Sequence, residues 1–208
     1  MKTNSSECLK SVLNRLKNID YIKPEDIPNI ELYMDQVTTF MDEHLKSTKR
    51  YDSDKILTKT MINNYAKNDL LPPPVKKKYS KEHMLLLIFI YYFKNILSIT
   101  DIQSLLNPLT DKYFNTEDGM NLQDIYNEVF GFEKEHAEYL MKDIVEEYKK
   151  SSTAFSDAPE EEQEFLQLFS FICILSFDVY IKKMLIEKLI DQIPKPESKK
   201  DVKKDKAK

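Results

Sequence analysis

The sequence predicts an all-α protein, and three observations lead to that prediction. Apolar residues recur at the three- and four-residue spacing of amphipathic helices along most of the 208-residue chain. The nine prolines fall between those apolar stretches, where helix ends are expected. Only two glycines occur, Gly119 and Gly131, so the glycine-rich loops that bind nucleotide phosphates cannot be built from this sequence.

Seven helices are expected in order along the chain. They cover residues 6–19, 30–45, 59–68, 81–97, 100–107, 122–150 with a break near Gly131, and 159–193. The first two carry apolar stripes on one side. Thr58 and Ser80 are favourable N-caps for the third and fourth helices. Thr100 and Gln103 have the spacing of a capping box for the fifth, which we expect to end before Pro108.

Two of these helices are unusually apolar. Residues 84–93 are apolar on all sides, so the helix that contains them should be buried on nearly every side. Residues 165–177 lack a charge, but this run of 13 leads directly into Asp178 and is too short to span a bilayer. We interpret it as part of a buried helix and expect no membrane-spanning segment.

Positive charge is concentrated in two segments of an otherwise acidic chain. The whole sequence has 31 Lys and Arg against 35 Asp and Glu, a net charge of -4. Residues 55–81 contain seven lysines and one acid, and residues 195–208 contain seven lysines and three acids. This placement suggests an anionic partner. A solvated lysine-rich surface is the plainer alternative.

The short helix at 59–68 is the strongest candidate binding element. A helical wheel gathers four polar residues on one face: Thr60, Asn63, Asn64 and Lys67. The opposite face, which should meet the core, carries Ile62, Tyr65 and Ala66. Amides, hydroxyls and ammonium groups can bond phosphates and the major-groove edges of bases. The lysines at 76–78, on extended backbone after three prolines, would add salt-dependent phosphate contacts.

The order of these segments resembles the winged helix-turn-helix of MerR-type bacterial transcription regulators. The matching stretches are MINNYAKNDLL at 61–71, KKKYS at 76–80 and ILSITDIQSLL at 96–106. They are similar to a family helix reading T-I-R-Y-Y-E-K-x-G-L-L, a wing ending Y-R-x-Y-S and a helix ending G-L-S-L-x-E-I-x-x-L-L. The run TKTMINNYAKNDLLPPPVKKKYSKEHMLLLIFIYYFK is also similar to an uncharacterised bacterial domain-of-unknown-function family, YkrK-like, which has no established activity.

The resemblance implies a DNA-binding surface made by the short helix and the wing. Together with the wheel, it gives ten candidate contacts: Lys59, Thr60, Asn63, Asn64, Tyr65, Lys67, Lys76, Lys77, Lys78 and Tyr79. Among them we expect Asn64 to read a base edge and Asn63, which replaces a family arginine, to contact the backbone. Asp69 stands where the family has a helix-closing glycine; aspartate is tolerable in a left-handed turn, but it places an acid near the proposed DNA surface.

Four segments are expected along the chain. They are an N-terminal amphipathic helix at 1–27, a winged helix-turn-helix domain at 28–109, a C-terminal helical region at 121–193 and a disordered basic tail at 194–208. Packing within the chain explains part of the apolar surface of the C-terminal region. Homodimerisation is its second candidate role, since MerR-type regulators resemble each other in a dimerising helix after the DNA-binding module. A small-molecule pocket there has no supporting polar cluster.

Catalytic and metal motifs are weak. Glu133 and His136 form one E-x-x-H pair, whereas a carboxylate-bridged di-iron site needs two. His136 and Glu138 match the H-x-E of zinc deaminases, but no P-C-x-x-C follows. Cys8 and Cys173 have no metal-ligand spacing, and no secretory leader is apparent. We therefore expect a cytoplasmic protein that is not an enzyme and holds no metal or cofactor.

These observations lead to one main hypothesis and one alternative. The main hypothesis is a protein that binds double-stranded DNA and regulates transcription. The alternative is a helical protein-interaction adaptor that keeps the winged fold but uses its lysines for an acidic protein surface. A steep fall of duplex binding with salt would favour the first over the second.

Overall fold

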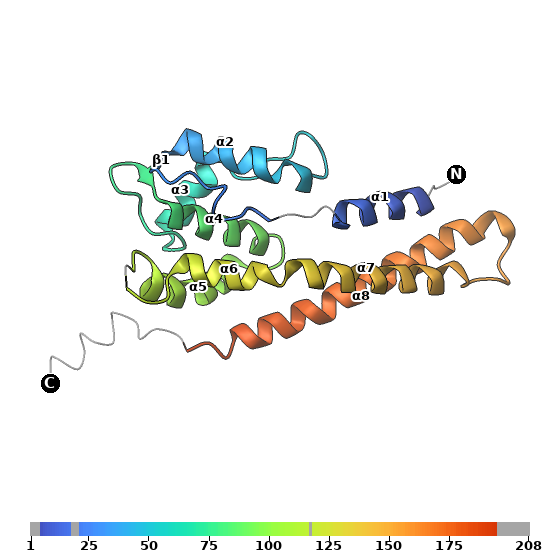
Figure 1. The fold of residues 1–208 in the computed structure, drawn as a ribbon. Coiled ribbons are helices and arrows are strands. Elements are labelled where there is room, and N and C mark those ends of the chain that lie inside the picture. The colour runs from blue at the N-terminus through green and yellow to red at the C-terminus, as the bar shows by residue number, and fades with distance from the viewer. Residues whose placement is uncertain (1–4, 18–20, 117, 195–208) are drawn as a thin grey trace. The chain divides into compact units, whose positions relative to one another are not determined.

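The computed structural model describes residues 5–17, 21–116 and 118–194. Within them the chain is mostly helical, with one small two-stranded sheet (Figure 1), so the helical prediction is confirmed. The described residues divide into two compact units. We call residues 22–126 with 186–194 the domain unit, and residues 5–17, 21 and 127–185 the helical unit. The expected disordered tail lies almost wholly at 195–208, outside the described residues.

The domain unit contains a short sheet and most of the shorter helices. In order they are β1 (Leu32–Tyr33), α2 (Met34–Leu45), the 3-10 helix η1 (Lys46–Thr48), α3 (Lys59–Lys67), β2 (Lys78–Tyr79), α4 (Lys81–Phe93), α5 (Ile99–Tyr113) and the start of α6 (Leu122–Gly131). The two strands pair antiparallel, with Leu32 opposite Tyr79 and Tyr33 opposite Lys78. Because β1 leads directly into α2 and β2 precedes α4 by one residue, this pairing fixes the starts of both helices together.

Helix α4 supplies the centre of the core in the domain unit. Its residues 83–91 are all buried, which confirms the prediction from its continuous apolar run. It contacts β2 and α5, and the Phe89 ring meets Tyr126 of α6 edge-on, with ring centroids 5.4 Å apart. Val37, Ile62 and Ile102 of the surrounding helices are fully buried. A helix without a polar side is stable only with neighbours of this kind on all sides.

The long connection between α2 and α3 is held down by α4 and its C-cap. Ile56 and Leu57 of the connection are buried. The Lys94 ammonium donates a hydrogen bond to the carbonyl of Ile56 at 2.6 Å, and the hydroxyls of Thr48 and Tyr91 are hydrogen-bonded to each other. The connection is longer than the tight turn of a simple helix-turn-helix. These hydrogen bonds at Thr48 and Ile56 nevertheless fix it near its start and near its end.

The N-cap of helix α5 lies two residues earlier than predicted. Ser98 is its N-cap: Ser98 Oγ accepts a hydrogen bond from the Asp101 amide at 3.1 Å, and Asp101 Oδ2 accepts one from the Ser98 amide at 3.2 Å. The predicted capping box at Thr100 and Gln103 is therefore wrong. Both pairs, Ser98 with Asp101 and Thr100 with Gln103, have the spacing of a capping box. In the helix that starts after Ser98, Ile102 is buried against the core.

The same helix also continues past Pro108, where we expected it to end. Pro108 lies inside α5, which reaches Tyr113. A proline removes one helical hydrogen bond and costs about 3 kcal/mol in a helix interior. Beyond the helix end, the Phe114 ring packs edge-on against His83, with centroids 4.9 Å apart. We attribute the continuation to such tertiary contacts, which outweigh the local preference.

The helical unit consists of long helices. They are α1 (Ser5–Lys17), the end of α6, α7 (Glu133–Ser152) and most of α8 (Glu160–Ile190), whose residues from 186 on belong to the domain unit. The end of α6 at Gly131 confirms the predicted break. The first half of α8 packs on the end of α7, where the Phe171 and Tyr148 rings meet edge-on with their centroids 5.4 Å apart. Just after α7, the Ala154 carbonyl accepts a hydrogen bond from Gln167 Nε2 at 3.1 Å.

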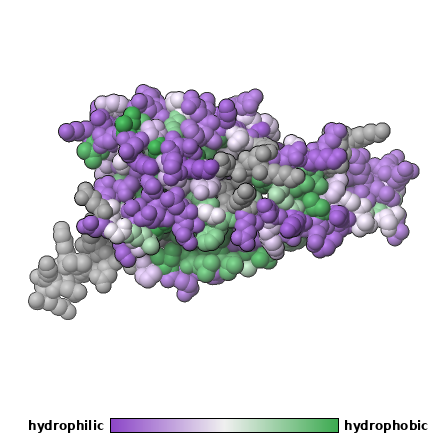
Figure 2. Space-filling view, viewed as in Figure 1, coloured by the Kyte–Doolittle hydropathy of each residue, from purple (hydrophilic) through white to green (hydrophobic). Residues whose placement is uncertain are grey.

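Much of α8 is exposed, so the prediction of a buried helix at 165–177 is wrong. Phe165 and Phe169 are 65% and 53% exposed. Figure 2 shows a hydrophobic band where Figure 1 places α8. By length and composition alone α8 could cross a membrane, and only 6% of its most apolar stretch is buried. Core helices also pass such a composition test, but this one is not covered by the described residues.

Candidate nucleic-acid interface

Helix α3 presents the polar face that the sequence predicts. Thr58 Oγ1 accepts a hydrogen bond from the Met61 amide at 3.2 Å and caps the helix, as expected. Ile62 is fully buried, which fixes the rotation of the helix about its axis. The side-chain amides of Asn63 and Asn64 make no hydrogen bond to any residue that the structure describes. The exposed residues of this face are Thr60, Asn63, Asn64 and Lys67.

Helix α3 ends in a left-handed turn at Asp69. Its φ is +53°, and the amides of Leu70 and Leu71 both donate to the Tyr65 carbonyl, at 2.9 and 3.3 Å. Asp69 thus adopts a left-handed turn, in which an aspartate is tolerable. Leu70 and Leu71 are buried, so the turn also directs the chain from the exposed helix back into the core before the three prolines.

The lysines that follow the prolines form a tight turn, and the prediction of extended backbone is wrong for two of them. Lys76 and Lys77 have φ values of +50° and +65°, and the Lys78 amide donates to the Val75 carbonyl at 2.9 Å. Two consecutive positive φ angles are typical of type I′ hairpin turns, which favour Asn and Gly. A left-handed conformation costs an ordinary residue roughly 1–2 kcal/mol. The chain adopts it because Lys78 must return to pair with Tyr33.

Not all lysines of this surface carry an uncompensated charge. Lys78 Nζ lies 3.6 Å from Glu31 Oε2 and 5.6 Å from the centre of the Tyr33 ring. Lys59 forms an ion pair with Asp35. Three exposed lysines of the candidate set have no ion-pair partner among the described residues: Lys67, Lys76 and Lys77.

The two tyrosines of the candidate set lie in the core. Tyr65 is 6% and Tyr79 2% exposed. Burial raises the pKa of both hydroxyls. Both side chains lie in the core beneath the exposed residues, so they are not among the proposed DNA contacts. The wheel already placed Tyr65 on the core side, and only the family resemblance made it a candidate.

Sequence reasoning missed His83, which holds the base of the turn. Its ring is buried, and Nδ1 accepts a hydrogen bond from the Ser80 amide at 3.0 Å. The Tyr79 ring meets it edge-on at 5.5 Å. Nε2 makes no hydrogen bond to any group in the part of the chain that the structure describes, although the carbonyls of Pro72 and Pro73 lie nearby. Burial lowers the pKa of His83. The sequence signal was its spacing from Ser80, which is that of a capping box with His in place of Glu or Gln.

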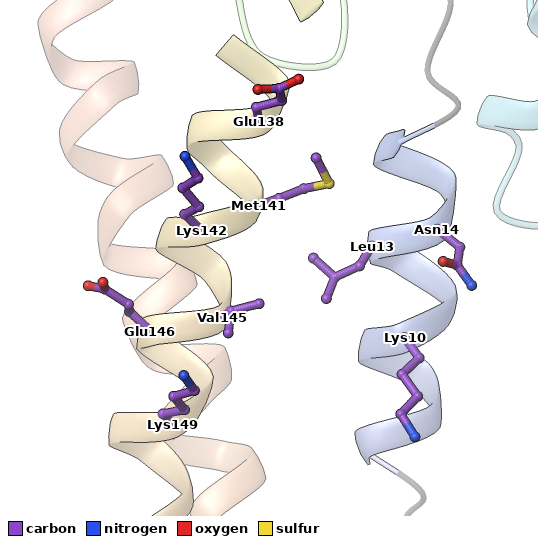
Figure 3. A pocket seen from close by; sticks show the side chains of 9 residues that line it. All are labelled: Lys10, Leu13, Asn14, Glu138, Met141, Lys142, Val145, Glu146 and Lys149. Carbon is purple, nitrogen blue, oxygen red and sulfur yellow. The ribbon is translucent and has the colours of Figure 1, made fainter. Parts of the chain in front are cut away.

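A separate cleft of about 820 Å³ lies between α1 and α7 in the helical unit (Figure 3). Leu13 of α1 and Met141 of α7 point toward one another across it. Charges of both signs surround this apolar floor, from Lys10, Glu138, Lys142, Glu146 and Lys149. Ligand sites normally combine an apolar pocket with a few convergent polar groups. Because these charges are distributed along the cleft, we assign it no ligand.

Comparison with known families identifies the domain that contains the candidate interface. Residues 22–129, just over half of the chain, match the family model described as a domain of unknown function, DUF1836. The chain belongs to the DUF1836 family. The match nearly coincides with residues 22–126 of the domain unit, so the DUF1836 domain contains α3, the lysine turn and His83. Helices α1, α7 and α8 lie outside it. No curated protein and no solved structure matches this chain.

Membership confirms the expectation of an uncharacterised domain family. The DUF1836 description carries no activity. A function for the domain must therefore be inferred from the physical properties of its surface.

Proposed function

We propose that the DUF1836 domain is a MerR-like, YkrK-like winged helix-turn-helix that binds double-stranded DNA, and that the protein regulates transcription. One observation carries the proposal. An exposed helix face with unbonded amides, on α3, lies in the same unit as a hairpin turn made of two lysines without ion-pair partners among the described residues. The first supplies groups that read bases, and the second supplies groups that bind phosphates.

In this proposal α3 enters the major groove. A groove of about 12 Å accepts one helix, and the polar side of α3 is free of the bulky residues that would prevent a close approach. Asn64 would pair with the N6 and N7 groups of an adenine, and Asn63 would bond a phosphate. Lys67, Lys76 and Lys77 would neutralise phosphates on the flanks. Three such contacts correspond to a salt slope of roughly -3.

The paired lysines should contribute less. A phosphate that approaches Lys59 or Lys78 must compete with the carboxylate of Asp35 or Glu31. Both carboxylates are well exposed, so they also repel the DNA backbone. We therefore expect weak non-specific binding, with specificity dependent on the base contacts.

The same carboxylates favour the second candidate function, a protein-interaction adaptor. A surface that carries Glu31 beside Lys78 and Asp35 beside Lys59 has both signs of charge. Mixed charge suits a protein partner better than a uniformly negative duplex. Weak salt dependence, with no preference among duplexes, would be the result expected of an adaptor.

The deciding experiment is a selection from randomised duplexes with the intact protein. Wild type, Asn63→Ala and Asn64→Ala would be compared with Asn95→Ala, an exposed asparagine outside α3, as the matched control. We expect a preferred sequence for wild type and the control, and a loss of preference at one base position for Asn64→Ala. That loss should correspond to about 1–3 kcal/mol at the preferred site. Four identical outcomes would show that α3 does not read bases.

A further inference from the structure

Helix α8 has an exposed apolar seam that the DNA-binding proposal does not use. The seam residues follow a four-three repeat: Phe165, Phe169, Ile172, Ser176, Val179 and Lys183. All six are exposed, and the four apolar ones are between 51% and 65% exposed. Such a repeat keeps side chains on one stripe along a helix and is the spacing of coiled-coil contacts.

The opposite side of α8 already has a partner. Phe171 contacts Tyr148 of α7, and Gln167 contacts Ala154 just after α7. At about 100° per residue these two residues lie roughly 120° and 160° around the helix from the middle of the seam. Asp178 also lies on that side and binds Lys182 at 2.6 Å. Around Gln167 and Phe171 the helix is therefore packed on one side and has its apolar seam on the other. Farther along, Ile181 and Leu185 are exposed on the packed side as well.

Charge along α8 has a clear direction. Residues 160–164 contain four glutamates and no base, whereas residues 182–188 contain three lysines and one glutamate. Two copies of this helix side by side would place like charges together in a parallel arrangement. In an antiparallel arrangement each acidic end meets a basic end.

We propose that this seam binds the same seam of a second copy of the chain, antiparallel and related by a two-fold axis. The seam positions pair symmetrically about residue 174: Phe169 faces Val179 of the second copy, and Ile172 faces its Ser176. Phe165 faces the aliphatic stem of Lys183, whose ammonium then lies one turn from Glu161 and Glu162. An isologous interface of this kind closes on itself and yields a dimer.

A lipid bilayer fits the same helix less well. A membrane span needs about 20 residues that are apolar on all sides facing lipid. Helix α8 instead packs on α7, a helix in which ten of twenty residues are charged. The Asp178 and Lys182 pair sits on α8 close to Glu147 and Asp143 of α7. Charged groups next to the apolar window favour a partner in water.

The first test is the mass of the intact protein by sedimentation equilibrium. Wild type should be a dimer at tens of micromolar, and Phe169→Glu should raise the dissociation constant at least tenfold. Phe177→Glu is the matched control, because Phe177 is 69% exposed but lies off the seam. Ser176→Leu should tighten the dimer, since it adds apolar surface opposite Ile172. Because these side chains are exposed, all three variants should keep the wild-type helical signal.

The second test is disulfide crosslinking between copies, with Cys8 and Cys173 replaced by serine. A mixture of Phe169→Cys and Val179→Cys proteins, one with a size tag, should form the mixed crosslink, and neither variant alone should crosslink. Self-crosslinking of each variant would overturn the antiparallel arrangement. A monomeric wild type would overturn the dimer. Binding to phosphatidylcholine vesicles that Phe169→Glu and Phe177→Glu weaken equally would overturn it in favour of a membrane.

Discussion

Lys94, the C-cap of α4, donates a hydrogen bond from its ammonium to the main-chain carbonyl of Ile56, 38 residues earlier in the chain. The donor is partly buried, and burial lowers the pKa of Lys94. Its ammonium also lies 5.0 Å from the centre of the Tyr91 ring. This bond fixes the connection that leads into α3, and therefore the position of the proposed DNA-binding face.

Replacement of Lys94 by methionine keeps most of the apolar stem and removes the donor. Hydrogen bonds to charged groups contribute roughly 1.5–3 kcal/mol, so we expect a loss of that size in the free energy of unfolding. Lys67→Met, at an exposed position of α3, should change stability by no more than about 0.5 kcal/mol. Urea unfolding of both variants checks this. Equal effects would mean that the Lys94 bond does not hold the connection.

The turn at Lys76 and Lys77 should be less stable than a turn with residues suited to positive φ. The double variant Lys76→Asn, Lys77→Gly should raise the thermal midpoint, because each residue then adopts its angle with less strain. The same change should weaken duplex binding and reduce the salt slope by about 2.

The alanine version of that turn separates strain from charge. Lys76→Ala, Lys77→Ala removes the same two charges but keeps ordinary residues at positive φ. It should weaken DNA binding as much as the first variant without raising the thermal midpoint. Unchanged salt slopes in both variants would remove the turn from the DNA interface, whereas equal midpoints would argue against strain there.

His83 should make the domain sensitive to mild acid. Because burial lowers its folded pKa, the unfolded chain takes up the proton first as the pH falls. The stability contribution is therefore complete above about pH 6.5, the usual histidine pKa, and declines below it. The nearby charge of Glu31 opposes the shift but does not reverse it.

His83→Gln tests this directly, because glutamine can accept the Ser80 hydrogen bond but does not titrate in this range. The variant should lose less stability than wild type between pH 7 and 5, as measured by thermal unfolding at several pH values. His44→Gln, at an exposed histidine of α2, is the control and should decline like wild type. Parallel curves for wild type and His83→Gln would contradict the assignment.

Pro108 should destabilise α5. Pro108→Ala restores a helical donor at an exposed position, so we expect a gain of about 1–3 kcal/mol in the free energy of unfolding. Part of the gain is offset because alanine also gives the unfolded chain more freedom. Pro159→Ala, at the residue before α8, should give no comparable gain. Chemical denaturation provides the measurement, and a loss of stability in Pro108→Ala would show that the proline is required by its surroundings.

Local patterns in the sequence were sufficient for most helices and for the polar face of the proposed interface. The caps at Thr58 and Ser80, the left-handed turn at Asp69 and the buried α4 follow from groups within a few residues of each other. Helix periodicity placed Asn63 and Asn64 on the outside of α3 for the same reason.

Contacts between distant segments decided the rest. The turn at Lys76 and Lys77 exists because β2 must pair with β1, more than forty residues earlier, and the lysines themselves prefer another conformation. The continuation of α5 past Pro108 likewise lies beyond what local spacing can predict. An apolar run such as 165–177 has the same composition whether its partner is the same chain, a second chain or a membrane. Only the arrangement of α8 on α7 showed that one side remains exposed, because burial depends on what else surrounds a helix.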